Sequence, residues 1–144
     1  MDADNVTRLR RVIGRLARLL NAAPVSENLT PTQASVLGLV AYRGPIGMTE
    51  LAEIEGLNPT MLSRVVGKLV DEDLVRRLPN PADQRAVQLE ATDHGHEVHG
   101  RIIASRTATV GKILDGLSPD VTKALLDALP ALEALAEGLR TKKP

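Results

Sequence analysis

The sequence predicts a mainly α-helical fold with one small β-hairpin, and three observations support this prediction. Apolar residues recur three or four positions apart over most of the chain, as they do on amphipathic helices. Residues 74–92 have a different pattern, that of two short strands. Near their end the apolar residues Val87, Leu89 and Ala91 alternate with polar residues, as in a strand with one buried face. Asn80 and the prolines beside it favour a turn. A lone hairpin of this size is marginally stable, so it must pack against the helices.

Composition narrows the class of protein. The chain has 144 residues, of which 43% are hydrophobic and 25% charged, which suits one globular domain spanning residues 1–144. Tyr42 is the only aromatic residue, so the core must be aliphatic. The absence of cysteine excludes disulfides and thiolate metal sites. No secretory signal and no apolar run of about 20 residues appear, so we expect a cytoplasmic protein with no membrane partner.

The N-terminal segment predicts an amphipathic helix. Val6, Leu9, Ile13 and Leu16 are spaced three, four and three residues apart, and the other faces of this segment carry five arginines. The pattern breaks at residues 21–28, which include Pro24 and Ser26. We therefore assign residues 1–29 to an outer helical region.

A compact module is expected over residues 30–92. Thr30 and Gln33 can form a capping box around Pro31, which predicts a helix to about Tyr42. A short extended piece at residues 46–48 follows. Thr49 is expected to cap the next helix, which ends at a tight turn with Gly56 in a left-handed conformation.

The next helix, residues 58–73, has two different sides. Asn58 is expected to cap it, with Pro59 at its first position. Its apolar side holds Met61, Leu62, Val65, Val66, Leu69 and Val70, and its polar side holds Thr60, Ser63, Arg64, Gly67 and Lys68. Two helices joined by a tight turn and followed by a hairpin with a charged tip form a winged helix-turn-helix, which is a DNA-reading device.

The polar side of this helix offers the chemistry that DNA recognition needs. Arg64 can donate two hydrogen bonds to guanine, and the hydroxyls of Thr60 and Ser63 suit bases or phosphates. Free amides at the helix start, beside Asn58 and Pro59, favour a phosphate. Lys68 adds a second positive charge. The alternative is an ordinary solvated helix face.

The hairpin tip supplies a second candidate contact. Arg76, Arg77 and Arg85 outnumber the single acid Asp83 there, and an arginine on a protruding hairpin can enter a minor groove. We choose Arg85 for this role. Asp83 repels phosphate, so we expect it to pair with Arg85 or Arg77 and to direct the guanidinium. The alternative is an aspartate that caps the turn beside a solvated arginine.

Two further helices are predicted after the hairpin. One begins after Thr92 and runs from Asp93 to about Gly116, and the last begins at Ser118 and is kinked or split by Pro130. The apolar seams of the outer helices exceed what one small module covers, so they should bury against a second copy. The residues expected in this homodimer contact are Val6, Leu9, Ile13, Leu16, Leu125, Leu129, Leu132 and Leu135.

The chain resembles the MarR family of bacterial transcriptional regulators over essentially its whole length. No single motif is specific, but their order and spacing together are. The matching segments are Leu29 to Gln33, Met48 to Glu53, Asn58 to Leu69, Asp83 to Arg85 and Leu89 to Gly95. The resemblance implies a homodimer, joined through residues 1–29 and 93–144, that binds a palindromic operator and usually represses transcription.

The resemblance also implies roles for individual residues. Thr60, Ser63, Arg64 and Lys68 would contact the groove and phosphates, and Arg77, Asp83 and Arg85 would form the wing constellation. Many relatives release DNA when a small, often phenolic, molecule binds between the dimer region and the reading module, but no motif marks that site. No cofactor is implied.

Three other functions compete with DNA-dependent regulation of this kind. His94, His96 and His99 cluster at the start of one helix and suggest a metal-responsive regulator, although solvated first-turn histidines are the simpler interpretation. The formal net charge of +0 leaves open a winged helix that contacts proteins and not DNA. No nucleophile–base motif, phosphate-binding glycine loop or carboxylate pair indicates an enzyme. The operator, the regulated genes and the ligand cannot be obtained from the sequence.

Overall fold

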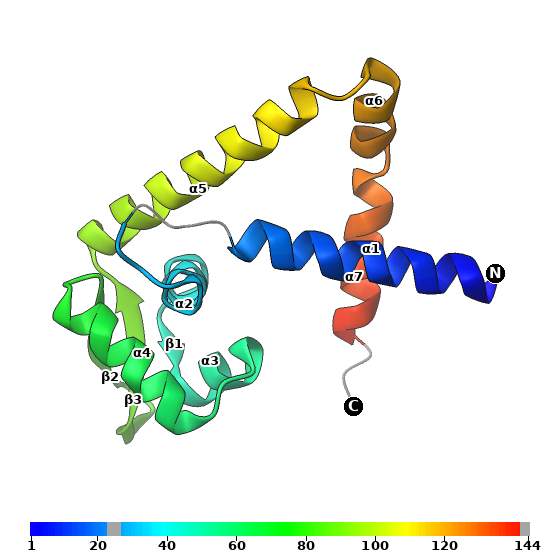
Figure 1. Ribbon diagram of the computed structural model, residues 1–144. Helices are drawn as coiled ribbons and strands as arrows, with labels where there is room; N and C mark the ends of the chain where they lie inside the picture. The colour runs from blue at the N-terminus through cyan, green and yellow to red at the C-terminus, as the bar shows by residue number, and fades with distance from the viewer. Residues whose placement is uncertain (23–26, 142–144) are drawn as a thin grey trace. The chain divides into compact units, whose positions relative to one another are not determined.

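The computed structural model describes residues 1–22 and 27–141 and contains two compact units, Met1–Arg106 and Thr107–Pro144. The predicted fold class is confirmed, because helices dominate and one small sheet carries the hairpin (Figure 1). Pro24 and Ser26 lie outside the described residues. The elements are α1 (Ala3–Ala22), α2 (Pro31–Arg43), β1 (Ile46–Gly47), α3 (Met48–Glu55), α4 (Pro59–Asp71), β2 (Val75–Asn80), β3 (Asp83–Ala91), α5 (Asp93–Asp115), α6 (Pro119–Asp127) and α7 (Leu129–Thr141).

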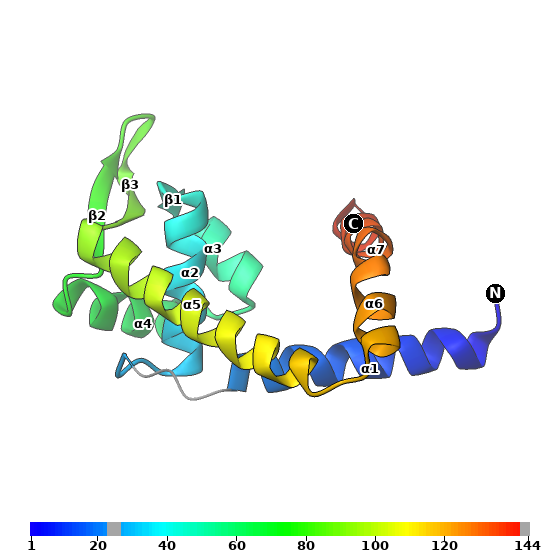
Figure 2. The same ribbon diagram turned by 90° about the horizontal axis from the view of Figure 1, so that it is seen from above.

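The sheet is antiparallel, with strand order β1–β3–β2. Val75 lies opposite Ala91, and the register shifts between Pro79 and Asn80, where the hairpin turns. Strand β1 pairs only with Leu89 and Gln88. The tip of the β2–β3 hairpin therefore continues beyond the third strand, as Figure 2 shows, and we call this hairpin the wing.

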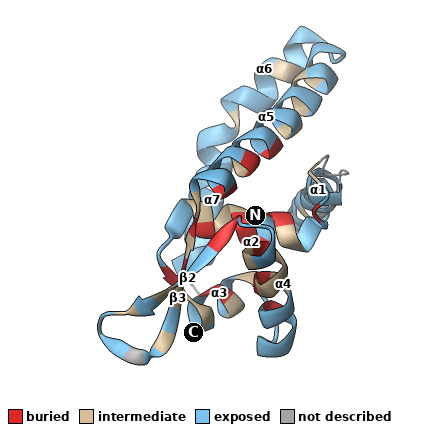
Figure 3. Ribbon diagram, turned by 90° about the vertical axis from the view of Figure 1, so that its left-hand side faces the viewer, coloured by how far each residue is buried: buried red, intermediate tan, exposed pale blue. Residues whose placement is uncertain are grey.

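The core of the first unit is aliphatic, as the composition predicted. Its fully buried side chains come from α2, α3, α4 and the sheet, and Figure 3 shows buried residues gathered in these elements. They are Leu37, Leu51, Leu62, Leu69, Leu89, Val36, Val40, Val66 and Val75. Tyr42, the one aromatic residue, is 85% exposed.

Most of the predicted helix ends are confirmed. Thr30 Oγ1 accepts from the Gln33 amide at 3.1 Å, and Gln33 Oε1 accepts from the Thr30 amide at 3.0 Å, which completes the capping box. The expected cap at Thr49 is wrong. Helix α3 begins at Met48 with Gly47 as N-cap and no side-chain cap, because β1 leads directly into the helix.

The predicted split at Pro130 is confirmed, since α6 ends at Asp127 and α7 begins at Leu129. Proline has no amide hydrogen, and its ring clashes with the carbonyl four residues earlier, so one continuous helix is disfavoured there. Helices α1, α6 and α7 contain no buried residue. Among the described residues, no helix is long and apolar enough to cross a membrane.

A tight joint connects the end of α4 to the start of α5. Thr92 Oγ1 donates to the Asp73 carbonyl at 2.6 Å, and the Thr92 amide donates to the Leu74 carbonyl at 3.1 Å. Gly95 of α5 packs so closely on Leu74, the residue before β2, that an added Cβ would overlap the Leu74 carbonyl oxygen. Only glycine fits there, and the orientation of α4 is thereby tied to α5.

Candidate DNA interface

A helix-turn-helix is formed by α3 and α4. Gly56 ends α3 with φ 66°, a left-handed conformation that glycine adopts without strain. Ser35 Oγ lies 3.1 Å and 3.0 Å from the two Glu55 carboxylate oxygens, so α2 holds the end of α3. Asn58 then caps α4 by accepting from the Met61 amide at 2.8 Å, as predicted. The direction of α4 is therefore fixed at its first turn.

The buried seam of α4 determines which side chains face outward. Leu62, Val66 and Leu69 are at most 1% exposed. The remaining face carries Pro59, Thr60, Ser63 and Arg64, all of which are exposed. Arg64 has no ion-pair partner within 4.0 Å among residues 1–22 and 27–141, so its guanidinium is available to a ligand.

Two residues of α4 differ from the sequence expectation. Met61, assigned to the apolar side, is 50% exposed, because it precedes the buried seam at the start of the helix. Lys68 is only half-exposed, and its Nζ lies 2.9 Å from Glu72 Oε1. This hydrogen bond lowers the pKa of the Glu72 carboxyl. Lys68 is thus less available for DNA than Arg64.

The wing tip is organised by turn-capping bonds. Asp83 Oδ1 accepts from the Arg85 amide at 3.0 Å, and Asn80 Oδ1 accepts from the Ala82 amide at 3.0 Å. In the described part of the chain, Asp83 forms no ion pair with Arg77 or Arg85. The expected ion pair is absent and the turn-capping alternative is observed, because the carboxylate is used by the backbone two residues ahead.

The three wing arginines occupy different environments. Arg76 Nε lies 2.8 Å from Glu90 Oε2 across the two strands, which leaves it partly neutralised. Arg77 and Arg85 are exposed. Arg77 lies opposite Leu89, at the base of the wing, whereas Arg85 lies near its tip. The structure therefore offers Arg85 as a protruding cation and Arg77 as one nearer the sheet.

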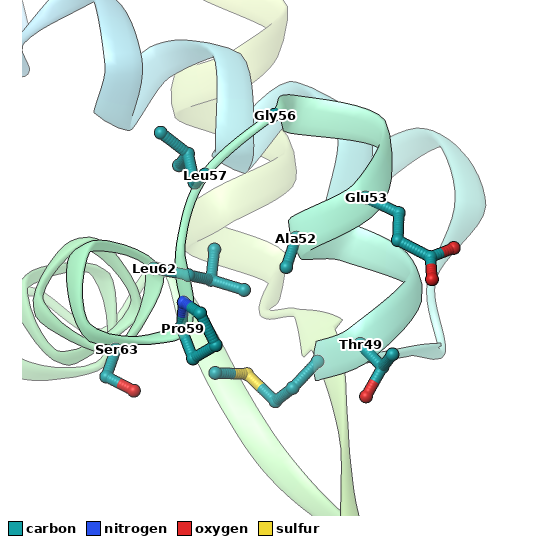
Figure 4. A pocket seen from close by; sticks show the side chains of 9 residues that line it. Thr49, Ala52, Glu53, Gly56, Leu57, Pro59, Leu62 and Ser63 are labelled. Atoms are coloured by element: carbon teal, nitrogen blue, oxygen red, sulfur yellow. The ribbon is translucent and has the colours of Figure 1, made fainter.

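A cavity of about 490 Å³ lies between α3 and α4, and no motif in the sequence indicates it. Figure 4 shows Ala52 and Leu62 directed toward each other across this space, with Pro59 beside them. Its lining is Met48, Thr49, Ala52, Glu53, Gly56, Leu57, Pro59, Leu62 and Ser63. The cavity is mostly apolar, and Pro59 and Ser63 also belong to the outward strip of α4.

The three histidines do not form a common site. In the described part of the chain, no group of three or more His, Asp or Glu side chains is placed to hold a metal ion. His94 and His96 are exposed, whereas His99 packs on Gly38 of α2. The His99 Nδ1 is buried without a hydrogen-bond partner among the described residues, and burial lowers its pKa. Its role is packing between α5 and α2, which the sequence did not predict.

The residues expected in the dimer contact are all on the surface of the described chain. On α1 they are 36–50% exposed, and on α6 and α7 they are 38–48% exposed, although each is a large aliphatic residue. Together they are Val6, Leu9, Ile13, Leu16, Leu125, Leu129, Leu132 and Leu135.

Comparison with known proteins identifies the family. The family model described as "MarR family" matches residues 29–87. The uncharacterized HTH-type transcriptional regulator ML2140 of Mycobacterium leprae is 31% identical over 97 residues, covering 67% of this chain and 68% of the relative. The HTH-type transcriptional repressor MdtR of Bacillus subtilis is 26% identical over 115 residues, covering 80% of this chain and 72% of the relative.

The solved structures agree. The crystal structure of RV1404 from Mycobacterium tuberculosis superposes with a TM-score of 0.77 at 28% identity, covering 95% of each chain. The winged helix-turn-helix fold and the relatives ML2140 and MdtR, which are named transcriptional regulators, indicate a regulator of transcription and not an enzyme. This chain belongs to the MarR family of helix-turn-helix transcriptional regulators.

Proposed function

We propose that the chain is a repressor that binds a palindromic DNA operator as a homodimer. In this proposal α4 enters the major groove and the wing reaches the adjacent minor groove. Two copies related by a twofold axis present two α4 helices, so each half of a palindrome meets the same side chains. The DNA of a bacterial cell lies in the cytoplasm, which is where we place the protein.

The observation that carries the proposal is the exposed strip of α4. Thr60, Ser63 and Arg64 project from a helix whose opposite side is locked into the core. An unpaired guanidinium on the same strip as two hydroxyls matches the groups that read base edges and phosphates in a major groove. Asn58 and Pro59 place the free amides of the first turn beside this strip, where a phosphate is favoured.

The wing supports a second contact. Arg85 is exposed near a tip that the Asp83 and Asn80 bonds hold in one conformation. A preorganised turn loses less backbone freedom when it binds, so a contact made from it contributes more to affinity. We assign Arg85 to the minor groove and Arg77 to the flanking phosphates. Lys68 is assigned a weaker phosphate contact, because Glu72 competes for its ammonium group.

The homodimer is supported by the aliphatic surfaces of α1, α6 and α7. Monomeric proteins rarely expose contiguous apolar patches of this kind, and such patches usually bury against a partner. Most oligomers of soluble proteins are symmetric assemblies of one chain. A second copy is therefore the partner that we propose for these seams.

Repression and release are the finer parts of the proposal. The relative MdtR is named a transcriptional repressor, and we extend that sign of regulation to this chain. The α3–α4 cavity has the volume and apolar lining of a small-molecule site. A compound bound there contacts Pro59 and Ser63, so it competes with DNA. Adding a series of substituted benzoates to the DNA complex tests this step, and binding that no member of the series reduces argues against it.

Genome-wide mapping of bound DNA is the experiment that tests the function. A palindromic motif shared by the bound segments is the expected result, and its half-site spacing should be near one helical turn of DNA. Arg64→Ala is the matched variant, which should keep the protein folded and lose the motif. Bound segments without a common motif contradict sequence-specific recognition, and the absence of bound segments favours a module that contacts proteins.

A further inference from the structure

Four arginines form a row along α1. Arg8, Arg11, Arg15 and Arg18 are spaced three, four and three residues apart, which places them on one side of the helix. At 100° per residue they fall within an arc of about 80°, and the row is about 15 Å long. We call these four residues the arginine row. Arg10, the fifth arginine of α1, lies outside it, about 100° from Arg11.

The row is exposed and uncompensated. All four side chains are on the surface, and none has an ion-pair partner within 4.0 Å in the part of the chain that the structure describes. Asp4, one turn before Arg8, is the single acid of α1. Four adjacent like charges repel each other along a helix. Such a row is stabilised when an anion binds it.

The arginine row lies in the most basic stretch of this length in the sequence, since residues 8–18 hold five of the 18 basic residues. The module that reads DNA contains six basic residues and eight acidic ones, so it is net negative despite its proposed ligand. Its basic residues are Arg43, Arg64, Lys68, Arg76, Arg77 and Arg85, and its acidic residues are Glu50, Glu53, Glu55, Asp71, Glu72, Asp73, Asp83 and Glu90. Affinity for a polyanion depends mainly on the number of phosphates neutralised. The module alone therefore lacks the electrostatic attraction that is usual for a DNA-binding protein.

The opposite side of α1 is apolar and faces away from the row. Its exposed residues Val6, Leu9, Val12, Ile13, Leu16, Leu19 and Leu20 fall within an arc about 140° wide, centred about 130° from the centre of the row. If this arc is covered in the proposed dimer, the arginine row is the side of α1 that remains in water. The two sides can thus serve different partners at the same time.

We infer that the arginine row binds the phosphate backbone of double-stranded DNA, as a sequence-independent contact additional to α4 and the wing. This inference rests on the proposed DNA-binding function. A duplex carries one negative charge per about 1.7 Å of axis with both strands counted, so a stretch as long as the row holds about nine charges, of which the nearer ones can face it. Guanidinium groups match phosphate oxygens well. An anionic membrane is disfavoured, because insertion requires the apolar arc that the dimer uses.

The test is the salt dependence of binding to a short duplex of random sequence. The variant is Arg11→Gln/Arg15→Gln, because glutamine keeps helix propensity and removes charge. The slope of log Kd against log salt should decrease in magnitude by about 0.9 for each phosphate that the variant no longer neutralises, and by about 1.8 for two such phosphates. Arg11→Lys/Arg15→Lys should retain the slope, since the charge is kept.

Matched controls separate this contact from other causes. Arg10→Gln is next to Arg11 and changes the charge equally, and it should leave the slope nearer to the wild-type value than Arg11→Gln does. Circular dichroism and size exclusion verify that each variant is folded and dimeric. The number of duplexes per dimer distinguishes a contact with the operator duplex, one per dimer, from a contact with a second duplex, two per dimer.

Two results overturn the inference. A double Gln variant with the wild-type slope means that the row does not touch DNA and serves an acidic protein or solvent. A double Gln variant that falls apart into monomers means that the row belongs to the subunit contact. If the wild-type protein itself fails to bind any duplex, the proposed function fails and not the row alone.

Discussion

The winged helix-turn-helix module (residues 30–92) and the outer helices α1, α6 and α7 have the same kind of apolar pattern, but only the module buries it within the chain. In the module, Leu62 and Leu69 of α4 are at most 1% exposed, because α2 and the sheet cover them. On α1 and α7, Leu16 and Leu132 are 50% and 39% exposed, and these helices contain no buried residue. Periodic leucines thus predict a helix in both regions. The pattern does not show whether these leucines pack against other elements of the same chain or against a second copy. That depends on which elements the fold brings next to each helix.

This contrast separates two kinds of stability. The free energy of unfolding of the module should depend on packing within one chain and not on protein concentration. The stability of the outer helices should depend on association of two copies, so it should increase with protein concentration. Substitutions in the two regions should therefore be told apart by a dilution experiment.

Replacing an outer leucine by an acid should have the largest effect. Leu132→Asp places a carboxylate in the proposed subunit contact of both copies, and burial of an unpaired charge costs several kcal/mol per ion. We expect a monomer at concentrations where the wild-type chain is a dimer, measured by sedimentation or light scattering. Glu133→Gln, on the next residue of α7, is the control and should remain dimeric.

A second outer variant tests the other helix of the same contact. Leu16→Asp on α1 should also dissociate the dimer, because α1 exposes the same kind of seam. A dimer that persists in both variants means that these seams do not form the subunit contact. The contrast between module and outer helices would then be wrong.

Shortening a core leucine should have the next largest effect. Leu69→Ala removes a fully buried side chain of α4 and leaves a cavity, which costs about 2–5 kcal/mol of the free energy of unfolding. Denaturant unfolding at several protein concentrations measures this loss. Leu139→Ala on α7, which is 67% exposed, is the matched control and should cost far less. Equal losses at the two positions contradict the division between regions.

Within the module, the exposed arginine of α4 should matter more than its lysine. Arg64→Ala should weaken binding to the mapped operator by about 1–3 kcal/mol per half-site if the guanidinium reads a base. Lys68→Ala should cost less, because Glu72 already engages the ammonium group. Fluorescence anisotropy with operator and scrambled duplexes measures both. A loss for Arg64→Ala that is equal on the two duplexes identifies a phosphate contact.

The wing should contribute less than Arg64 to the free energy of operator binding. Arg85→Ala should weaken operator binding without changing the melting temperature, because the side chain is exposed. If it contacts one phosphate, the salt slope should fall by about 1. Asp83→Ala should also weaken binding, through loss of the bond that fixes the tip, whereas Asp83→Asn keeps an acceptor oxygen and should bind normally. Unchanged binding in Arg85→Ala removes the wing tip from the mechanism.

Local signals in the sequence were sufficient for most of the fold. The capping box at Thr30 and Gln33, the cap at Asn58 and the split at Pro130 each depend on neighbouring residues, and the structure confirms them. Contacts between distant residues were not predictable. Neither the α3–α4 cavity nor the packing of His99 on Gly38 has a local signal, because α3, α4, α2 and α5 come together only in the fold.

The candidate site was also predicted only in part, because some of its features depend on local sequence and others on the folded backbone. The outward strip of α4 follows from helical periodicity, but the bond from Asp83 does not. An aspartate can accept either from a guanidinium or from a backbone amide two residues ahead, and both choices fit one sequence. Backbone geometry at the tip decides between them, and it selects the amide of Arg85. Lys68 is a similar case, since its pairing with Glu72 competes with DNA.

The smallest expected effect comes from pH and tests how α5 is attached to the module. Burial lowers the pKa of His99 in the folded chain, and the nearby charges of His96 and Arg106 lower it further. The folded state then binds fewer protons than the unfolded state. Stability should be fully present above the ordinary histidine pKa, near 6.5, and should decline as the pH falls toward the lowered folded value.

Melting temperatures of the wild-type chain and His99→Gln between neutral and mildly acidic pH measure this effect. The decline should be reduced most in His99→Gln and only slightly in His96→Gln, because His96 adds a smaller contribution to the lowered pKa of His99 than burial does. The acid-induced loss should remain smaller than that from any core substitution, because His99 is only partly buried and water screens its charge. A decline of the same size in His99→Gln as in the wild-type chain means that the attachment of α5 to α2 does not depend on the protonation of this residue.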